Sequence, residues 1–483
     1  MTRTQKWVLA ITSTAALMVA LDQLVVSTAL NAIRNSLHAS LATLEWTANA
    51  YSLSFAVLLI TGAALGDRFG RRRMFTVGLS VFSLASAACA LAPDTGTLIA
   101  ARAVQGAGSA LVMPLAVALL TSAFPQEKRG SALGIFTALA GLAVVGGPLV
   151  GGAVTEGISW QWIFWINVPI GAVLVPLALI RTSESHVPRV RPDVPGLALV
   201  SAGMLGLVWG LVRAGAAGWG SAEVVSALAA GAALTVAFAV WETRAREPML
   251  PVGLFTDRTF TSGNIAMFLH TGALFSSVFF LAQYLQVSLG YGPLGAGLRF
   301  LPWTLPLFVV APAVGRALDR IGSRLLLPLG LVLQFAGLGW VALTIADGRS
   351  YASAVAALVI AGCGASMAIP AGQNAVMNAV PRDAIGKASG VYNTARQLGG
   401  AFGIAVLAVV FAAKGGYASA ADFRAGVAPA LGVAAGMSAL AALAAVLMRQ
   451  RQAAGAPPAP SPVTVTVTAD ADAGADPADA TAR

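Results

Sequence analysis

Apolar stretches long enough to cross a lipid bilayer recur along the whole chain. A membrane helix needs roughly 20 mainly apolar residues, and fourteen segments meet that requirement. We expect transmembrane helices at approximately 8–30, 46–66, 74–92, 98–120, 131–153, 161–180, 195–213, 222–241, 260–287, 297–317, 324–345, 351–373, 388–412 and 428–448. Only 10% of the residues are charged, whereas ordinary soluble domains carry roughly 25%. A soluble globular protein and a disordered chain are therefore excluded, and the pattern predicts an all-α integral membrane protein.

Lys and Arg are divided unequally between the two sides of this expected membrane fold. With a cytoplasmic N-terminus, 22 of the 30 Lys and Arg residues fall on the cytoplasmic side and 6 on the other. Because basic loops stay in the cytoplasm, this asymmetry predicts a multi-pass protein of the cell (plasma) membrane with both termini inside. It also accounts for the net charge of +10, so we expect the lipid bilayer as a partner and no nucleic acid.

Polar segments divide the expected spans into groups. Two of these polar segments are connections on the cytoplasmic side. The third is the C-terminal tail, which is rich in Ala, Pro, Thr and Asp, a composition typical of disorder. We expect an N-terminal six-helix half (1–180), a cytoplasmic linker (181–194), two inserted transmembrane helices (195–241), a cytoplasmic connection (242–259), a C-terminal six-helix half (260–451) and a disordered cytoplasmic tail (452–483).

A short charged motif occurs twice. Asp67-Arg68-Phe69-Gly70-Arg71-Arg72 follows the second expected span, and Asp319-Arg320-Ile321-Gly322-Ser323-Arg324 follows the tenth. Both fit the pattern Asp-Arg-x-Gly-x-Arg. If spans seven and eight are an insertion, the two motifs occupy equivalent loops of two six-helix halves. Parallel repeats of this kind are typical of transporters that work by alternating access.

On these motifs the chain resembles the fourteen-helix drug:proton antiporters of the major facilitator superfamily, over roughly residues 10–450. The first charged loop matches that family's signature, with Ala63 in place of its first Gly. Gly134 and the run Gly147-Pro148-Leu149-Val150-Gly151-Gly152 are similar to its antiporter motif, with Ala143 where a middle Gly is usual. Four further segments carry the resemblance: Arg102–Gly108, Trp160–Gly171, Tyr284–Pro302 and Asn393–Gly400.

The resemblance implies a secondary transporter that exports amphiphilic drugs or antibiotics by alternating access, with the proton as coupling ion and no other cofactor. It implies a major facilitator fold and a conformational latch that opens and closes as the two halves rock. The residues assigned to this latch are Asp67, Arg68, Gly70, Arg71, Arg72, Asp319 and Arg320. Physically, Asp67 at a helix end is expected to face the positive N-terminus of another helix. The residues assigned to a tightly packed hinge are Gly134, Gly147, Pro148, Gly151 and Gly152.

Asp22 is the carboxylate expected deep in a span. It lies about 14 residues into the first span, roughly 21 Å from the cytoplasmic end, and Arg102 lies about 4 residues, roughly 6 Å, into the fourth span from the other side. Both therefore fall in the outer half of the membrane, within reach of each other. A charge at the bilayer centre costs at least roughly 2.5–3.5 kcal/mol. We interpret Asp22 and Arg102 as the proton-coupling pair; a fixed structural ion pair is the alternative.

Polar and aromatic residues in the spans are candidates for a substrate pocket, although such residues also suit lipid-facing or helix-packing positions. The candidates are Trp46, Asn49, Tyr51, Gln105, Phe275, Phe279, Gln283, Tyr284, Asn393 and Arg396. The deep charges of Asp22, Arg102 and Arg396 sum to +1. This sum favours neutral, zwitterionic or anionic amphiphiles over dications.

Other functions on the same chain stay open. A metabolite uniporter or symporter would use the same fold, and a membrane receptor without transport is a second alternative. The sequence contains no pattern of metal ligands, nucleotide-binding glycines or a catalytic triad, so we expect neither an enzyme nor a metal site. We expect a monomer whose partners are a small amphiphilic substrate and the bilayer.

Overall fold

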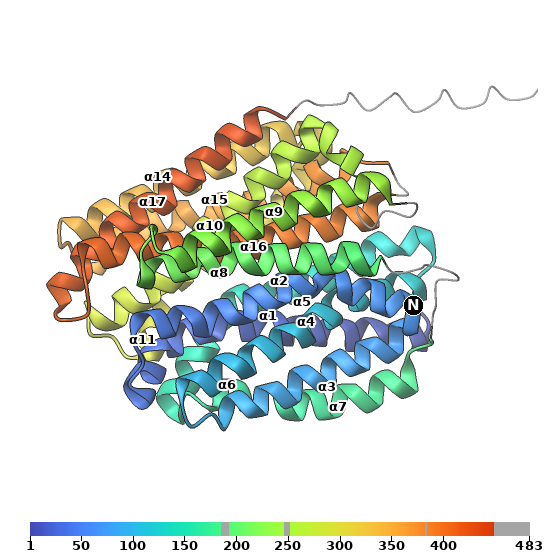
Figure 1. Cartoon of the computed structure of the whole chain (residues 1–483), viewed down its shortest axis with the longest axis horizontal. Helices are drawn as coiled ribbons and strands as arrows, with labels where there is room; N and C mark the ends of the chain where they lie inside the picture. Colours follow the sequence, from blue (N-terminus) through green and yellow to red (C-terminus); the bar gives the residue numbers. More distant parts are fainter. Residues whose placement is uncertain (185–192, 246–251, 382–383, 449–483) are drawn as a thin grey trace, which may run out of the picture. The chain divides into compact units, whose positions relative to one another are not determined.

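The structure is a computed structural model that describes residues 1–184, 193–245, 252–381 and 384–448. These residues form α-helices and one short 3-10 helix (Figure 1), and no strand occurs among them. The expected all-α architecture is thus observed. The expected tail, 452–483, and the middle of each expected cytoplasmic connection lie outside the described residues.

The helices follow the expected spans closely. Their bounds are α1 Arg3–Leu37, α2 Leu41–Phe69, α3 Arg71–Ala90, α4 Thr95–Ala123, α5 Gln126–Gly157, α6 Trp162–Trp165, α7 Asn167–Arg181, α8 Val194–Ala217, α9 Ala222–Arg244, η1 Val252–Thr256, α10 Arg258–Val287, α11 Pro293–Arg299, α12 Leu301–Thr304, α13 Pro306–Ile321, α14 Ser323–Ala346, α15 Tyr351–Asn378, α16 Ile385–Lys414 and α17 Ala420–Val446. Two expected spans are broken, the sixth into α6 and α7 and the tenth into α11, α12 and α13.

Many of these helices are long and apolar enough to cross a membrane. In the described ranges 11 helical segments meet this condition, and 12 do so if the bent pair Trp46–Leu59 and Thr61–Phe69 is one span. The chain is therefore a multi-pass membrane protein, while the count of fourteen spans stays a prediction.

Local chemistry explains where the helices begin. Side chains of Ser, Thr and Asp accept hydrogen bonds from first-turn N–H groups, as seen at Thr2, Ser40, Asp94, Asp193, Ser221, Asp257 and Ser419. The glycines of the repeated motif act differently. Gly70 (φ 104°) and Gly322 (φ 78°) both have a positive φ, which glycine adopts without strain. Each ends one helix and begins the next, so the two motifs share one local geometry.

The packing places three groups of helices side by side. Helices α1–α5 and α7 contact one another, as do α10 and α13–α17, while α8 and α9 pair with each other. The first two groups meet where α2 contacts α16 and α1 contacts α10, and the short helix α11 packs on α5. Helix α8 contacts both α2 and α16. The expected division into two six-helix halves stays a prediction.

Candidate functional site

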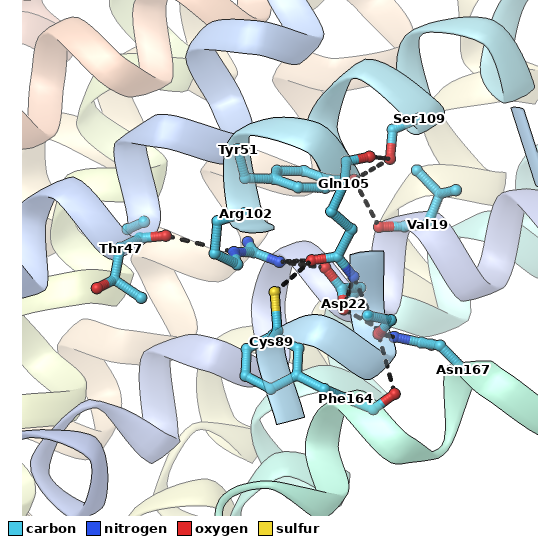
Figure 2. A network of polar contacts seen from close by, with 12 residues as sticks. Val19, Asp22, Thr47, Tyr51, Cys89, Arg102, Gln105, Ser109, Phe164 and Asn167 are labelled. Carbon is cyan, nitrogen blue, oxygen red and sulfur yellow. Dashed lines mark hydrogen bonds and ion pairs between the residues drawn. The ribbon is translucent and has the colours of Figure 1, made fainter. Parts of the chain in front are cut away.

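The carboxylate of Asp22 is buried among the N-terminal helices and forms an ion pair. Asp22 and Arg102 are each 1% exposed. Arg102 Nη1 donates to Asp22 Oδ2 at 2.5 Å, which joins α1 to α4 (Figure 2). The two side chains expected at the same depth are therefore in direct contact.

Two side-chain amides complete the environment of this carboxylate. Gln105 Nε2 and Asn167 Nδ2 donate to Asp22 Oδ1 at 2.9 and 2.8 Å. The same two nitrogens donate to Ser86 Oγ, at 3.1 and 3.0 Å. An ionised carboxylate accepts hydrogen bonds on both oxygens, so donors from α4 and α7 match the ionised form of Asp22.

Arg102 has further partners that hold its guanidinium in place. Its Nη1 donates to Gln105 Oε1 at 2.7 Å, and its Nε donates to the Thr47 carbonyl oxygen at 3.3 Å. The guanidinium carbon lies 4.3 Å from the centroid of the Tyr51 ring, and the Tyr51 hydroxyl lies 2.8 Å from Ser109 Oγ. Tyr51 and Gln105, which were expected in the substrate pocket, instead surround the ion pair (Figure 2).

The two charges of this ion pair interact strongly. Two unit charges about 4 Å apart attract each other by roughly 4 kcal/mol at an effective dielectric constant of about 20. The cost of desolvating two buried charges is of similar size, so a buried ion pair is a weak source of stability. Addition of one proton to Asp22 would remove that attraction and leave the charge of Arg102 without its carboxylate.

A separate hollow lies between α1, α2, α10 and α16. Its cavity volume is only about 30 Å³ in this conformation, and the hollow is partly open to solvent. The residues that line it are Gln23, Leu24, Val26, Ser27, Leu30, Ala48, Ser52, Phe275, Val278, Phe279, Gly400 and Ile404. Phe275 and Phe279 are pocket residues expected from the sequence. Asp22 does not line this hollow, although it precedes Gln23 in the chain.

The remaining expected pocket residues lie elsewhere. In α2, Trp46 contacts Trp209 of α8, and Asn49 is buried. In α10, Gln283 accepts a hydrogen bond from Tyr417, and Tyr284 lines a second hollow between α10, α14 and α15. In α16, Asn393 donates to the Ser389 carbonyl oxygen, and the Arg396 guanidinium lies over the Tyr392 ring. Trp46 therefore packs against the expected inserted helices.

Polar residues without charge are the ones that sequence reasoning missed. Asn167 bonds to Asp22, Ser86 bonds to the amides of Gln105 and Asn167, and Gln23, Ser27 and Ser52 line the hollow. Each is a polar side chain inside an otherwise apolar span. A polar residue in an apolar span indicates a candidate site in the sequence, but it does not show which way the side chain faces.

The first charged loop places two carboxylates at the start of α3. Arg71 Nε donates to Asp67 Oδ1 at 2.9 Å, so Asp67 near the end of α2 pairs with the first residue of α3. Glu184 lies at the same helix N-terminus: its two carboxylate oxygens accept from the backbone N–H groups of Arg72 and Arg73 at 2.9 and 3.2 Å. The turn at Gly70 explains both contacts, because it exposes the first turn of α3 and places Arg71 beside Asp67.

Less can be said of the second charged loop, because part of it lies outside the described residues. Arg68 in the first loop and Arg320 in the second are both exposed, and the side chain of Asp319 lies outside the described residues. The latch role of all these residues stays a prediction.

The glycine-rich segment of α5 packs this helix between α1 and α11. A Cβ atom at Gly147 would approach Leu24 Cβ to 2.6 Å, and one at Gly151 would approach Thr28 Oγ1 to 2.5 Å. On the other side, a Cβ at Gly152 would overlap the carbonyl oxygen of Pro293. Small residues allow this close approach. The surroundings of Gly134 lie outside the described residues.

Polar contacts join the N-terminal and C-terminal helices at the end of the bundle where α1 ends, here called the distal end. Gln286 Nε2 donates to the Thr28 carbonyl oxygen at 3.0 Å, and Glu156 Oε2 accepts from the Leu294 backbone N–H at 2.9 Å. The Arg34 guanidinium carbon lies 3.8 Å from the centroid of the Tyr417 ring. The two groups of helices are therefore held together at the distal end.

The Major Facilitator Superfamily family model matches this chain over residues 12–404 and 264–470. The cephamycin export protein CmcT of Amycolatopsis lactamdurans is 37% identical over 457 residues, which cover 92% of this chain and 93% of that protein. The tetracenomycin C resistance and export protein of Streptomyces glaucescens is 35% identical over 402 residues, 83% of this chain and 74% of that protein. The puromycin resistance protein pur8 of Streptomyces alboniger is 35% identical over 410 residues, 84% and 81% of the two chains.

Solved structures share the fold at low sequence identity. A bacterial homologue of the human lysosomal transporter Spinster, in an inward-facing and unoccupied conformation, has a TM-score of 0.67 at 17% identity, over 93% of this chain and 98% of that one. The peptide transporter POT in complex with sulfate has a TM-score of 0.66 at 16% identity, over 92% and 96%. Since the family match and the relatives each cover most of the chain, it belongs to the Major Facilitator Superfamily of membrane transporters.

Proposed function

We propose that this chain exports amphiphilic drugs or antibiotics in exchange for protons, by alternating access across the plasma membrane, with both termini in the cytoplasm. Relatives named for export of, or resistance to, antibiotics support the export direction and the substrate class. The observation that carries the proton coupling is the buried ion pair of Asp22 and Arg102, 2.5 Å apart.

The proposed cycle begins from the arrangement described above. In it Asp22 is ionised and held by three donors, the distal end is closed, and the hollow must widen to take up substrate. After the helices rock, the hollow opens at the distal end, which faces the outside in this proposal, and substrate leaves. A proton then binds Asp22, which weakens its contact with Arg102 and favours the return. Release of that proton to the cytoplasm restores the ion pair.

Helix α1 is suited to link the two events. Asp22 lies on the face toward α4 and α7, whereas Thr28 and Gln23 on the same helix bond to Gln286 of α10 and Gln397 of α16. A shift of α1 on protonation would therefore reach the contacts between the N-terminal and C-terminal helices directly. This connection turns a local charge change into movement.

The test is uphill transport in everted membrane vesicles with an imposed pH gradient. Asp22→Asn keeps the size of the side chain and removes its titration, so we expect loss of gradient-driven accumulation. Asp94→Asn is the matched control, because Asp94 is an exposed helix cap far from the ion pair, and we expect it to transport normally. Accumulation that persists in Asp22→Asn would refute the role of Asp22, and accumulation that ignores the pH gradient in the unmodified chain would favour a carrier coupled to another ion. Downhill flux without any uphill accumulation in the unmodified chain would favour a uniporter.

A further inference from the structure

We infer that the hollow between α1, α2, α10 and α16 binds uncharged amphiphiles that carry an amide, carbonyl or hydroxyl group, and that the side-chain amides of Gln23 and Gln397 select them. This inference rests on the proposed export function and specifies its substrate class.

The lining of the hollow contains no charged side chain among the described residues. Most of it is aliphatic, and Phe275 and Phe279 add an aromatic wall. The polar groups are the amide of Gln23 and the hydroxyls of Ser27 and Ser52. An apolar cavity with a few neutral donors and acceptors suits an amphiphile whose polar group is uncharged.

Gln23 and Gln397 form a hydrogen bond between the two groups of helices. Gln23 Nε2 donates to Gln397 Oε1 at 3.2 Å. Gln397 is 9% exposed. It does not line the hollow itself and is connected to it through its bond with Gln23. Each amide keeps unused capacity, since a carboxamide offers two N–H donors and an acceptor oxygen. A ligand with an amide or a hydroxyl could bond both side chains by replacing the bond between them.

The charged side chains next to this amide pair in the sequence are those of Asp22 and Arg396. Asp22 directs its carboxylate toward Arg102, Gln105 and Asn167, and is 1% exposed. Arg396 precedes Gln397, but its guanidinium carbon lies 5.6 Å from the centroid of the Tyr392 ring, one turn back along α16. A cationic ligand in the hollow would therefore find no free carboxylate.

The aromatic wall does not compensate for that absence. A cation over a phenyl ring gains only a modest attraction, somewhat larger when it is desolvated. Transfer of an unpaired charge out of water costs far more than this. An uncharged ligand avoids the penalty and still makes the apolar contacts, so the lining discriminates against cations.

The experiment compares uncharged and permanently cationic probes. The full chain is expressed in an efflux-deficient bacterial host, and efflux is measured with chloramphenicol and linezolid as uncharged probes and with ethidium and tetraphenylphosphonium as cations. We expect efflux of the uncharged probes and none of the cations. Preferred efflux of the cations would overturn the inference and leave the export function standing, whereas efflux of none of the four would overturn both.

Variants then test the amide pair. We expect Gln23→Leu and Gln397→Leu each to lower the efflux rate of the uncharged probes about tenfold, and Gln23→Glu to gain ethidium efflux by adding a carboxylate to the lining. Gln161→Leu is the matched control, since this glutamine lies in the connection before α6. Unchanged efflux in both leucine variants at equal protein level, or no ethidium efflux by Gln23→Glu with normal protein level, would overturn the role of the pair.

The coupling mechanism is separated from the substrate class by counterflow, which needs no pH gradient. In Asp22→Asn vesicles preloaded with chloramphenicol, we expect exchange of labelled chloramphenicol to continue while uphill efflux stops. Uphill efflux that survives with unchanged probe preference would refute the proton site and leave the inference intact. Counterflow that fails for chloramphenicol but proceeds for ethidium would refute the inference.

Discussion

The ion pair of Asp22 and Arg102 should show strong energetic coupling in a double-mutant cycle. The variants are Asp22→Asn, Arg102→Met and the two combined. Both side chains are 1% exposed, and removal of one partner leaves the other charge buried, which typically costs about 3–5 kcal/mol. The double variant removes both charges. With the N–O contact at 2.5 Å, the two charge centres lie about 4 Å apart. The free energy of unfolding lost in the double variant should therefore be smaller, by roughly 4 kcal/mol, than the sum of the losses in the two single variants.

The assay is equilibrium unfolding of the purified chain in mixed micelles, repeated on an exposed pair as control. Arg349 Nη2 lies 2.9 Å from Asp347 Oδ2, and the two side chains are 63% and 53% exposed. For such a pair the coupling energy should be about 0–1 kcal/mol. If the cycle at Asp22 and Arg102 were additive to within about 0.5 kcal/mol, the two side chains would not sense each other's charge, and the reasoning behind the proton site would be refuted.

Three further predictions concern other parts of the structure. Gly152→Leu should block closure at the distal end, because its side chain would overlap Pro293; higher reactivity of cysteines introduced at that end would show this. Glu184→Gln should destabilise the chain by about 0.3–1 kcal/mol, since a carboxylate at the α3 N-terminus is favoured by the helix dipole; unfolding in mixed micelles measures the change. Hydrogen bonds from Thr97 lower the pKa of Asp94. The ionised Asp94 carboxylate therefore stabilises the folded chain above the ordinary Asp pKa, and this contribution is lost as the pH falls below about 4. The unfolding midpoint of Asp94→Asn should depend less on pH in that range than the midpoint of the unmodified chain.

Helix positions could be predicted from the sequence because bilayer thickness sets a length that apolar runs must reach. The depth argument for Asp22 and Arg102 succeeded for the same reason: a fixed rise per residue converts position in a span into height. Gly70 and Gly322 were also informative, since both glycines of the repeated motif occupy the positive-φ region that ends one helix and begins the next.

Side-chain direction could not be predicted in the same way. A membrane helix is apolar on nearly all sides, so no polar stripe marks which face meets lipid, a cavity or another helix. Tyr51 and Gln105 were therefore assigned to the pocket, although they face Arg102. The partner of the α3 N-terminus was missed for a different reason, because Glu184 lies 112 residues beyond Arg72 and only the fold brings them together.

The placement of polar groups on α1 bears on how exchange would be coupled. Successive residues of a helix point about 100° apart, so Asp22 faces Arg102 while Gln23 faces the hollow and Gln397. An uncharged substrate in that hollow gains no Coulomb energy from Asp22, so it does not compete with a proton for the same carboxylate. Proton and substrate must then act on each other through the position of α1, and the coupling energy depends on how differently the two arrangements of this helix bind each of them.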